Sequence, residues 1–183
     1  MNATGRESAI LSRPVDVAHL PPEEVDIVAG EREKTALASA YDLVAVRALS
    51  ATAMLTPGPR GSVNVEGRVV ADIVQTCVVS LVPVDQHIDE PFHLRFVRSV
   101  DAPAVPKPGA EVVIEPGAED PPEILDGPTI DVGAVVEETF VLAIDPYPRA
   151  PSATLPTDVV EPAVTDSPFA ALAALAKPPA EKD

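Results

Sequence analysis

The side chains best suited to chemistry in this chain are a single cysteine, three histidines and a group of arginines. Cys77 is a candidate nucleophile, but thiolate chemistry needs a neighbouring base or cation, and the residues beside it in the sequence supply neither. Cys77 also falls on the apolar positions of an alternating stretch, where a free cysteine behaves as a small hydrophobe. We therefore expect Cys77 to be buried and structural.

Metal binding and acid–base catalysis find no support in the spacing of the other polar residues. His19, His87 and His93 are dispersed, and one cysteine cannot build a zinc site of the usual thiolate type. Carboxylates are numerous, but no spacing selects two of them, and the common phosphate-loop, dinucleotide and nucleophile-elbow motifs are missing. We expect a protein that is not an enzyme, with no catalytic residue, cofactor, metal or small-molecule substrate.

A group of arginines is the candidate contact surface for RNA or for a partner. Its members are Arg47, Arg60, Arg68, Arg95 and Arg98. Arg68 and Arg95 fall on the polar positions of two successive predicted strands, and the planar guanidinium fork suits phosphate oxygens. In a second interpretation, Glu66 and Asp72 neutralise these arginines as cross-strand pairs.

The stretch from Ser62 to Phe96 must position most of these residues. Its odd-numbered positions from 63 to 81 are largely apolar and include Cys77, Val79 and Leu81, whereas the even ones are mostly polar. After a break at Pro83 the alternation resumes at Ile88. A period of two predicts strands with one buried face, so we expect a long antiparallel hairpin.

Shorter patterns place the remaining elements. The segment 43–55 predicts a strand whose apolar phase changes near Arg47, which indicates a β-bulge, and 56–61 predicts a turn that leads into the hairpin. A helix is expected from about Glu31 to Tyr41, and an edge strand within 8–17 because it contains a proline. Asp131 is expected to cap a helix over 132–143 that turns Glu137 and Glu138 outward. Together these elements predict an α+β fold, with an antiparallel meander or barrel-like sheet and a few short helices.

Composition sets the domain organisation and the compartment. The 22 prolines of the 183 residues predict a single domain over 8–146 with a proline-rich acidic excursion at 101–122, a linker at 147–167 and a short apolar helix at 168–177. The net charge of −16 argues against a simple RNA-coating protein. The acidic run from 101 to 145 is either a solvated surface or a contact for basic proteins. One cysteine and no signal or membrane-spanning pattern predict a cytoplasmic protein that does not contact membranes.

Three ordered blocks resemble the YceD-like family, the bacterial large ribosomal RNA subunit accumulation proteins. They are the hairpin stretch 67–96 that contains Thr76-Cys77, the stretch 124–149 with Ile130-Asp131 and Glu137-Glu138, and the terminal 167–177. Many members carry Cys-x-x-Cys where this chain has Cys77-Val78-Val79-Ser80. The chain is similar to the subgroup without that pair seen in alphaproteobacteria, so a metal-binding role inferred for other members does not carry over.

The resemblance implies a non-enzymatic role in the synthesis, processing or stability of 23S ribosomal RNA, and hence in ribosome biogenesis and large-subunit assembly. The implied partners are 23S rRNA or components of the pre-50S particle, reached directly or through a ribosomal protein. The alternative is an acidic adaptor that holds a basic ribosomal protein or an RNA-processing enzyme without touching RNA. The resemblance brings no catalytic residue.

Overall fold

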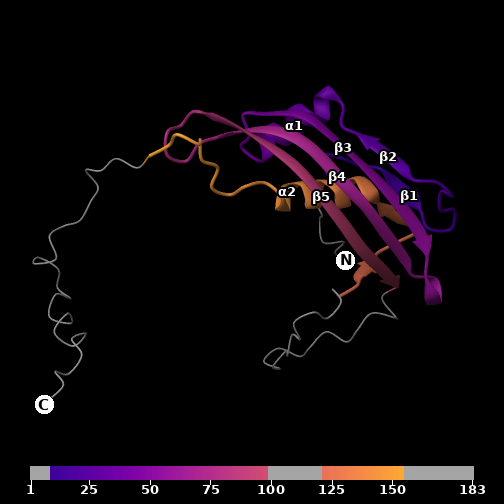
Figure 1. Cartoon of the computed structure of the whole chain (residues 1–183). Helices are drawn as coiled ribbons and strands as arrows, with labels where there is room; N and C mark the ends of the chain where they lie inside the picture. Colours follow the sequence, from indigo (N-terminus) through magenta and orange to yellow (C-terminus); the bar gives the residue numbers. More distant parts are fainter. Residues whose placement is uncertain (1–8, 99–120, 155–183) are drawn as a thin grey trace, which may run out of the picture.

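A computed structural model describes residues 9–98 and 121–154 of the chain (Figure 1). Seven strands, two α-helices and one 3-10 turn make up this part. In chain order they are β1 (Pro14–Asp16), β2 (Val25–Val28), α1 (Glu31–Ala40), β3 (Ala45–Pro57), η1 (Pro59–Gly61), β4 (Val63–Thr76), β5 (Pro83–Arg98), β6 (Glu123–Leu125), β7 (Thr129–Asp131) and α2 (Val132–Leu142).

The main sheet has the strand order β2-β3-β4-β5-β6, and β1 pairs with β7 in a separate two-stranded sheet. All neighbours in the main sheet are antiparallel except β5 and β6, which are parallel. The predicted α+β fold and the predicted meander of β3, β4 and β5 are confirmed. Within the described residues the sheet stays open and does not close into a barrel.

The β-bulge predicted in the first strand of the meander lies where the phase of the apolar residues changes. The register between β3 and β4 shifts between Val46 and Ala48, and Arg47 is the extra residue. One inserted residue swaps the two faces of a strand. Val46 on one side of the bulge and Leu49 on the other are therefore both buried.

The hairpin of β4 and β5 buries one face, as its alternation predicts. Val65, Val69 and Ala71 are fully buried, and Ile88 and Phe92 lie on the same face of β5. The prediction was wrong at the tip, because β4 ends at Thr76 and the loop 77–82 breaks the alternation. Val79 is only partly buried, and Leu81 is 75% exposed with a φ of 60°. β5 starts at Pro83, so the polar run 85–87 lies inside the strand.

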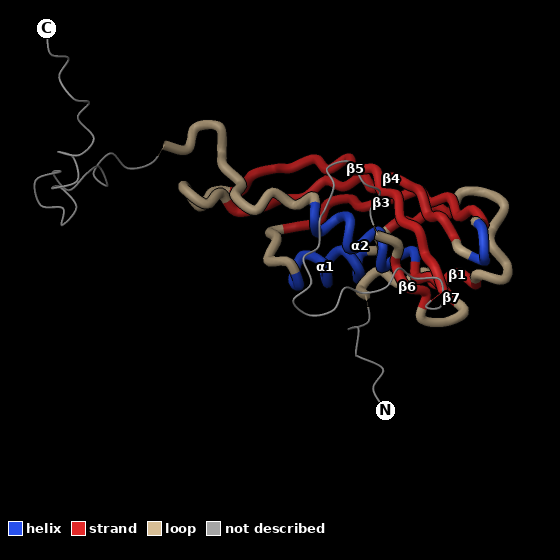
Figure 2. The backbone as a smooth tube through the Cα atoms, turned by 90° about the horizontal axis from the view of Figure 1, so that it is seen from below, coloured by secondary structure: helices blue, strands red, loops and turns tan. Residues whose placement is uncertain are grey.

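Both α-helices cover the buried face of the sheet (Figure 2). Leu37 of α1 joins the core, and α2 contributes Val132, Val136 and Phe140, which repeat at helical spacing. The predicted cap is confirmed, since the Asp131 carboxylate accepts a hydrogen bond from the backbone N–H of Ala134 at 3.2 Å. α2 ends at Leu142, one residue before the predicted end.

The outward orientation predicted for Glu137 was wrong. Glu137 is 8% exposed, whereas Glu138 is exposed as predicted. Along α2, Gly133 and Val141 lie one turn before and one turn after Glu137, so the row of residues that contains it faces the protein interior. A close approach of the chain at Gly133, where an added Cβ would meet the backbone of Leu11, keeps this row buried.

The predicted linker begins with residues that touch the hairpin tip. The backbone N–H of Val78 donates to the carbonyl of Pro148 at 2.9 Å. Residues 155–167 of the predicted linker, the predicted helix at 168–177 and residues 101–120 of the acidic excursion lie outside the described residues.

Candidate nucleic-acid interface

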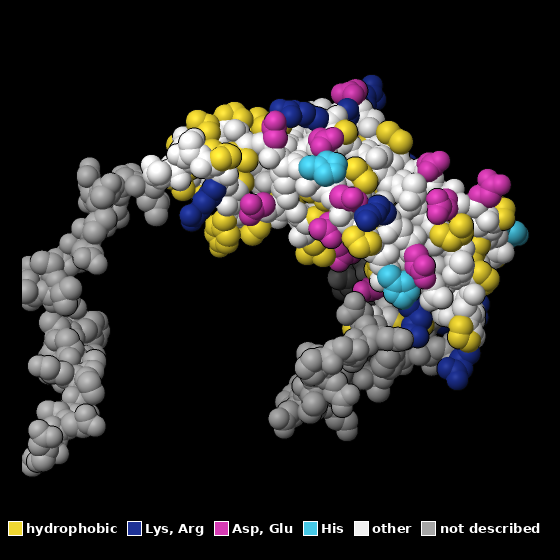
Figure 3. All heavy atoms as spheres, viewed as in Figure 1, with side chains coloured by type: hydrophobic (Ala, Val, Ile, Leu, Met, Phe, Trp, Pro, Cys, Tyr) yellow, Lys and Arg dark blue, Asp and Glu magenta, His cyan; other side chains and the backbone are white. Residues whose placement is uncertain are grey.

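The solvent-facing side of β3, β4 and β5 carries a row of acidic side chains, each paired with an arginine or a histidine. Its members are Arg47–Asp85 at 2.9 Å, Arg68–Asp89 at 2.8 Å, His87–Asp72 at 2.8 Å and His93–Glu66 at 3.6 Å. Figure 3 shows acidic, basic and histidine side chains interspersed over this face. The second interpretation was wrong about the partners, because Glu66 and Asp72 pair with histidines, whereas Asp85 and Asp89 pair with Arg47 and Arg68.

The five predicted arginines do not form one patch. Arg95 lies opposite Asn64 in the hairpin, whereas Arg68 lies four residues further along β4. At about 3.3 Å per residue, those four residues span about 13 Å. Arg47 lies further still, at the bulge. Arg47 and Arg68 are also each held by an aspartate, which reduces what they can offer to a phosphate.

The other three arginines converge on one small cavity. We call Arg60, Arg95 and Arg98 the arginine corner; they line a cavity of about 140 Å³ with Pro59, Ser62, Val97 and Pro122. The corner lies where β3 turns into β4, at the lower right of Figure 3, where basic side chains gather. One water molecule takes about 30 Å³ in the liquid, so the cavity has room for a group the size of a phosphate.

No acidic side chain from the described residues lines this cavity. Within the same part of the chain, neither Arg60 nor Arg98 forms an ion pair with a carboxylate. Two guanidinium groups beside a cavity that no described acid lines favour an anionic ligand, because each can offer two parallel N–H bonds to phosphate oxygens.

The backbone of η1 positions the corner. Arg60 has a φ of 57°, a left-handed conformation that is uncommon for a residue with a side chain, and Gly61 follows with a φ of 75°. The Ser62 side chain, which is buried, donates to the carbonyl of Pro59 at 2.9 Å and closes the turn. The guanidinium of Arg98 lies against Gly61, where an added Cβ would be 3.4 Å from it.

Cys77 is buried, as predicted, but its sulfur is surrounded by hydrogen-bond donors. Its Sγ accepts hydrogen bonds from the backbone N–H groups of Val79, Ser80 and Ala150 at 3.3–3.4 Å. A hydrogen bond from the Ser80 side chain, followed by those backbone donors, lowers the pKa of the Cys77 thiol to about 6 against the opposing effect of burial. The donor from Ala150 belongs to a segment distant in the sequence, so sequence reasoning could not find it.

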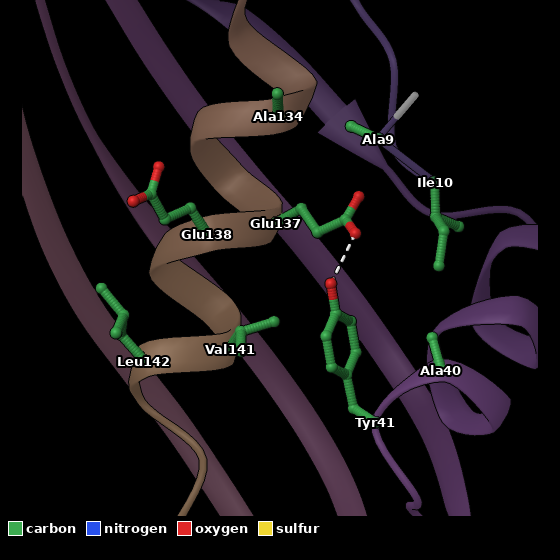
Figure 4. A pocket seen from close by; sticks show the side chains of 9 residues that line it. All are labelled: Ala9, Ile10, Ala40, Tyr41, Ala134, Glu137, Glu138, Val141 and Leu142. Carbon is green, nitrogen blue, oxygen red and sulfur yellow. Dashed lines mark hydrogen bonds between the residues drawn. The ribbon is translucent and has the colours of Figure 1, made fainter. Parts of the chain in front are cut away.

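Glu137 joins three parts of the chain. Its carboxylate accepts hydrogen bonds from the backbone N–H of Leu11 at 2.9 Å and from the Tyr41 hydroxyl at 2.7 Å (Figure 4). Burial, together with the Glu137 hydrogen bond and charge, raises the pKa of Tyr41 to about 12. The arrangement ties α2 to α1 and to the N-terminal segment, which indicates a structural role for this buried acid.

Neither a metal site nor a membrane span is found in the described part of the chain. Its histidine, cysteine and acidic side chains form no cluster of three or more that could hold a metal ion. Its helices are too short and insufficiently apolar to span a membrane.

These features define the class of protein: an acidic α+β protein with an open sheet and an arginine-lined corner. The family model described as "Large ribosomal RNA subunit accumulation protein YceD" matches residues 65–176, which is more than half of the chain, so the protein belongs to this family. The match covers Arg68, Arg95 and Arg98 but not Arg47 or Arg60. No curated protein and no solved structure matches the chain.

Proposed function

We propose that this protein promotes the accumulation of 23S ribosomal RNA during large-subunit assembly by binding RNA phosphates at the arginine corner. The family to which the chain belongs supports the role in rRNA accumulation. The observation that supports direct contact is the convergence of Arg60, Arg95 and Arg98 on one cavity without an acidic lining residue from the described part of the chain. The role is non-enzymatic and cytoplasmic.

The net charge of −16 does not prevent this contact. At physiological ionic strength the screening length is about 8 Å, so the distant acids are largely screened at the corner. On the hairpin face, the acidic pairs of Arg68 and His87 lie further along the strands. Glu66 lies only two residues from Asn64, the residue opposite Arg95, and its carboxylate faces His93. Contact is therefore local, and its strength depends on a few arginines.

The salt dependence of binding to a 23S rRNA fragment tests the proposal. Each arginine that neutralises a phosphate adds about 0.7–0.9 to the slope of log affinity against log salt. The double variant Arg60→Gln with Arg98→Gln is therefore expected to lower the slope by about 1.4–1.8 and to weaken binding, while circular dichroism stays unchanged.

The matched control replaces two arginines that already have acidic partners. Arg47→Gln with Arg68→Gln removes the same charge but is expected to change the slope much less, because Asp85 and Asp89 hold these side chains. If the corner variant keeps the wild-type slope, direct contact at the corner is refuted. The adaptor, which reaches RNA through a basic ribosomal protein or a processing enzyme, then becomes the better explanation.

A further inference from the structure

A long groove lies between β5 and α2, and its lining residues differ from those of the arginine corner. It consists of two adjoining cavities of about 480 and 540 Å³ that share Leu94, Val135 and Glu138. Figure 4 shows that Glu138 and Leu142 project from one side of α2, whereas Glu137 and Val141 project from the other, toward Tyr41. The groove lies on the Glu138 side.

Apolar side chains from β5 and α2 contribute to the floor of the groove. Phe92, Leu94 and Phe96 line it from β5, and Val135 lines it from α2. At its rim Leu142 is 80% exposed. An apolar side chain so exposed beside other apolar side chains is the pattern of a contact surface for another protein.

Acids surround this floor. Glu90, Glu123, Asp126 and Glu138 line the two cavities, and all four are exposed. The only basic side chain among the described lining residues is His93, which already lies near Glu66 on the other face. RNA is therefore repelled from the groove, whereas a cationic chain is attracted.

The edge of β5 at the groove is open within the described residues. β5 pairs with β4 along its full length, but β6 pairs only with Phe96, Val97 and Arg98. Unpaired backbone groups at a sheet edge form a template for an added strand. In an edge strand only alternate residues direct their N–H and C=O groups away from the paired neighbour, and Pro91 has no N–H to donate. Beside the groove, the described edge therefore offers the outward-facing backbone groups within residues 92–94 for pairing.

We propose that this groove binds an extended segment of a partner protein in which basic and apolar residues alternate. Apolar side chains of the segment enter the groove between β5 and α2, and its basic side chains meet Glu90, Glu123 and Glu138. The backbone of the segment pairs with the outward-facing backbone groups within residues 92–94 of β5. A second copy of this chain is the poorer occupant, because each copy carries a charge of −16. This inference does not depend on RNA binding at the arginine corner.

Fluorescence anisotropy with the full chain and a labelled octapeptide of alternating lysine and valine tests the proposal in the absence of RNA. Saturable binding is expected, with fivefold to tenfold loss for Glu90→Lys and for Glu138→Lys, because single surface ion pairs are weak. Leu142→Ser is expected to weaken binding severalfold. Asp26→Lys on β2, at the opposite edge of the sheet, makes the same charge change and is expected to leave binding unchanged.

Four outcomes would overturn the proposal. Equal binding of a lysine–serine octapeptide would mean nonspecific attraction to an acidic protein. Equal losses for Asp26→Lys and Glu138→Lys would remove the groove as the site. The proline-rich acidic excursion contains one apolar run, Val112-Val113-Ile114. If the peptide binds only after these three residues are changed to serine, this chain's own segment is the occupant. New protection of the outward-facing amides within residues 92–94 from hydrogen exchange on peptide binding would support strand pairing, and unchanged exchange would refute it.

Discussion

Removing the Glu137 carboxylate is expected to destabilise the domain although the residue is a charged group in an apolar interior. Glu137→Leu removes the hydrogen bonds to the backbone N–H of Leu11 and to the Tyr41 hydroxyl. The first of these bonds is buried and joins residues 126 positions apart. The variant therefore leaves a buried donor without a partner and disconnects α2 from the N-terminal segment.

The size of the loss follows from two opposing effects. Hydrogen bonds to a charged group contribute about 1.5–3 kcal/mol each, and a buried unsatisfied N–H costs about 1–3 kcal/mol. Burying a leucine in place of a carboxylate returns about 1.5–3 kcal/mol. We expect a net loss of about 2–4 kcal/mol for Glu137→Leu, given these magnitudes. Glu137→Gln is expected to lose about 1 kcal/mol, because an amide can still accept from Leu11 and donate to Tyr41.

Urea unfolding followed by circular dichroism measures these differences, with the midpoint and slope compared between variants. The neighbouring Glu138→Leu is the matched control, and since Glu138 is exposed we expect a change within about 0.5 kcal/mol. Tyr41→Phe combined with Glu137→Leu is expected to cost less than the sum of the two single changes, because they remove one shared bond. If Glu137→Leu is as stable as the wild type, the reasoning is refuted, because the free-energy cost of burying the carboxylate then equals or exceeds the contribution of its hydrogen bonds.

Three further outcomes are expected. The pKa of Tyr41 is raised from 10.0 to about 12. The contribution of Tyr41 to stability is therefore complete below pH 10 and is lost as the pH rises through 12. In Tyr41→Phe, we expect the stability measured by alkaline unfolding not to show this decrease. Ser80→Ala is expected to raise the pKa of Cys77 from about 6, as measured by the pH dependence of thiolate absorbance. Gly67→Ala is expected to cost about 1–3 kcal/mol in urea unfolding, because the new Cβ meets a β3 carbonyl and the Phe92 ring.

Each of these outcomes has a result that would contradict it. A wild-type alkaline transition in Tyr41→Phe would show that another group causes it. An unchanged thiol pKa in Ser80→Ala would mean that the backbone donors alone hold the thiolate. The pKa of Cys77 in the folded protein, about 6, lies below the ordinary thiol value of 9.0, so its stabilising contribution is complete above pH 9 and is lost as the pH falls through 6. A stable Gly67→Ala would show that the strands can separate at that point.

Features that depend on neighbours in the chain could be predicted from the sequence. The alternation of β4, the phase change at Arg47 and the cap at Asp131 each result from residues within a few positions of one another. A strand period, a bulge and an N-cap are local, so the residue order determines them directly. The family blocks, too, could be recognised from the residue order, and the family match supports them.

Only the tertiary structure decided how charges and donors pair. The sequence grouped five arginines as one candidate surface: Arg47, Arg60, Arg68, Arg95 and Arg98. The register of the hairpin and the bulge pair Arg47 and Arg68 with aspartates and bring the other three to one cavity. The partners of Glu137 lie 96 and 126 residues away in the sequence, and the Ala150 donor to Cys77 lies 73 residues away. Such contacts form only when packing closes long loops, so the local pattern of α2 could not show that one of its two glutamates is buried.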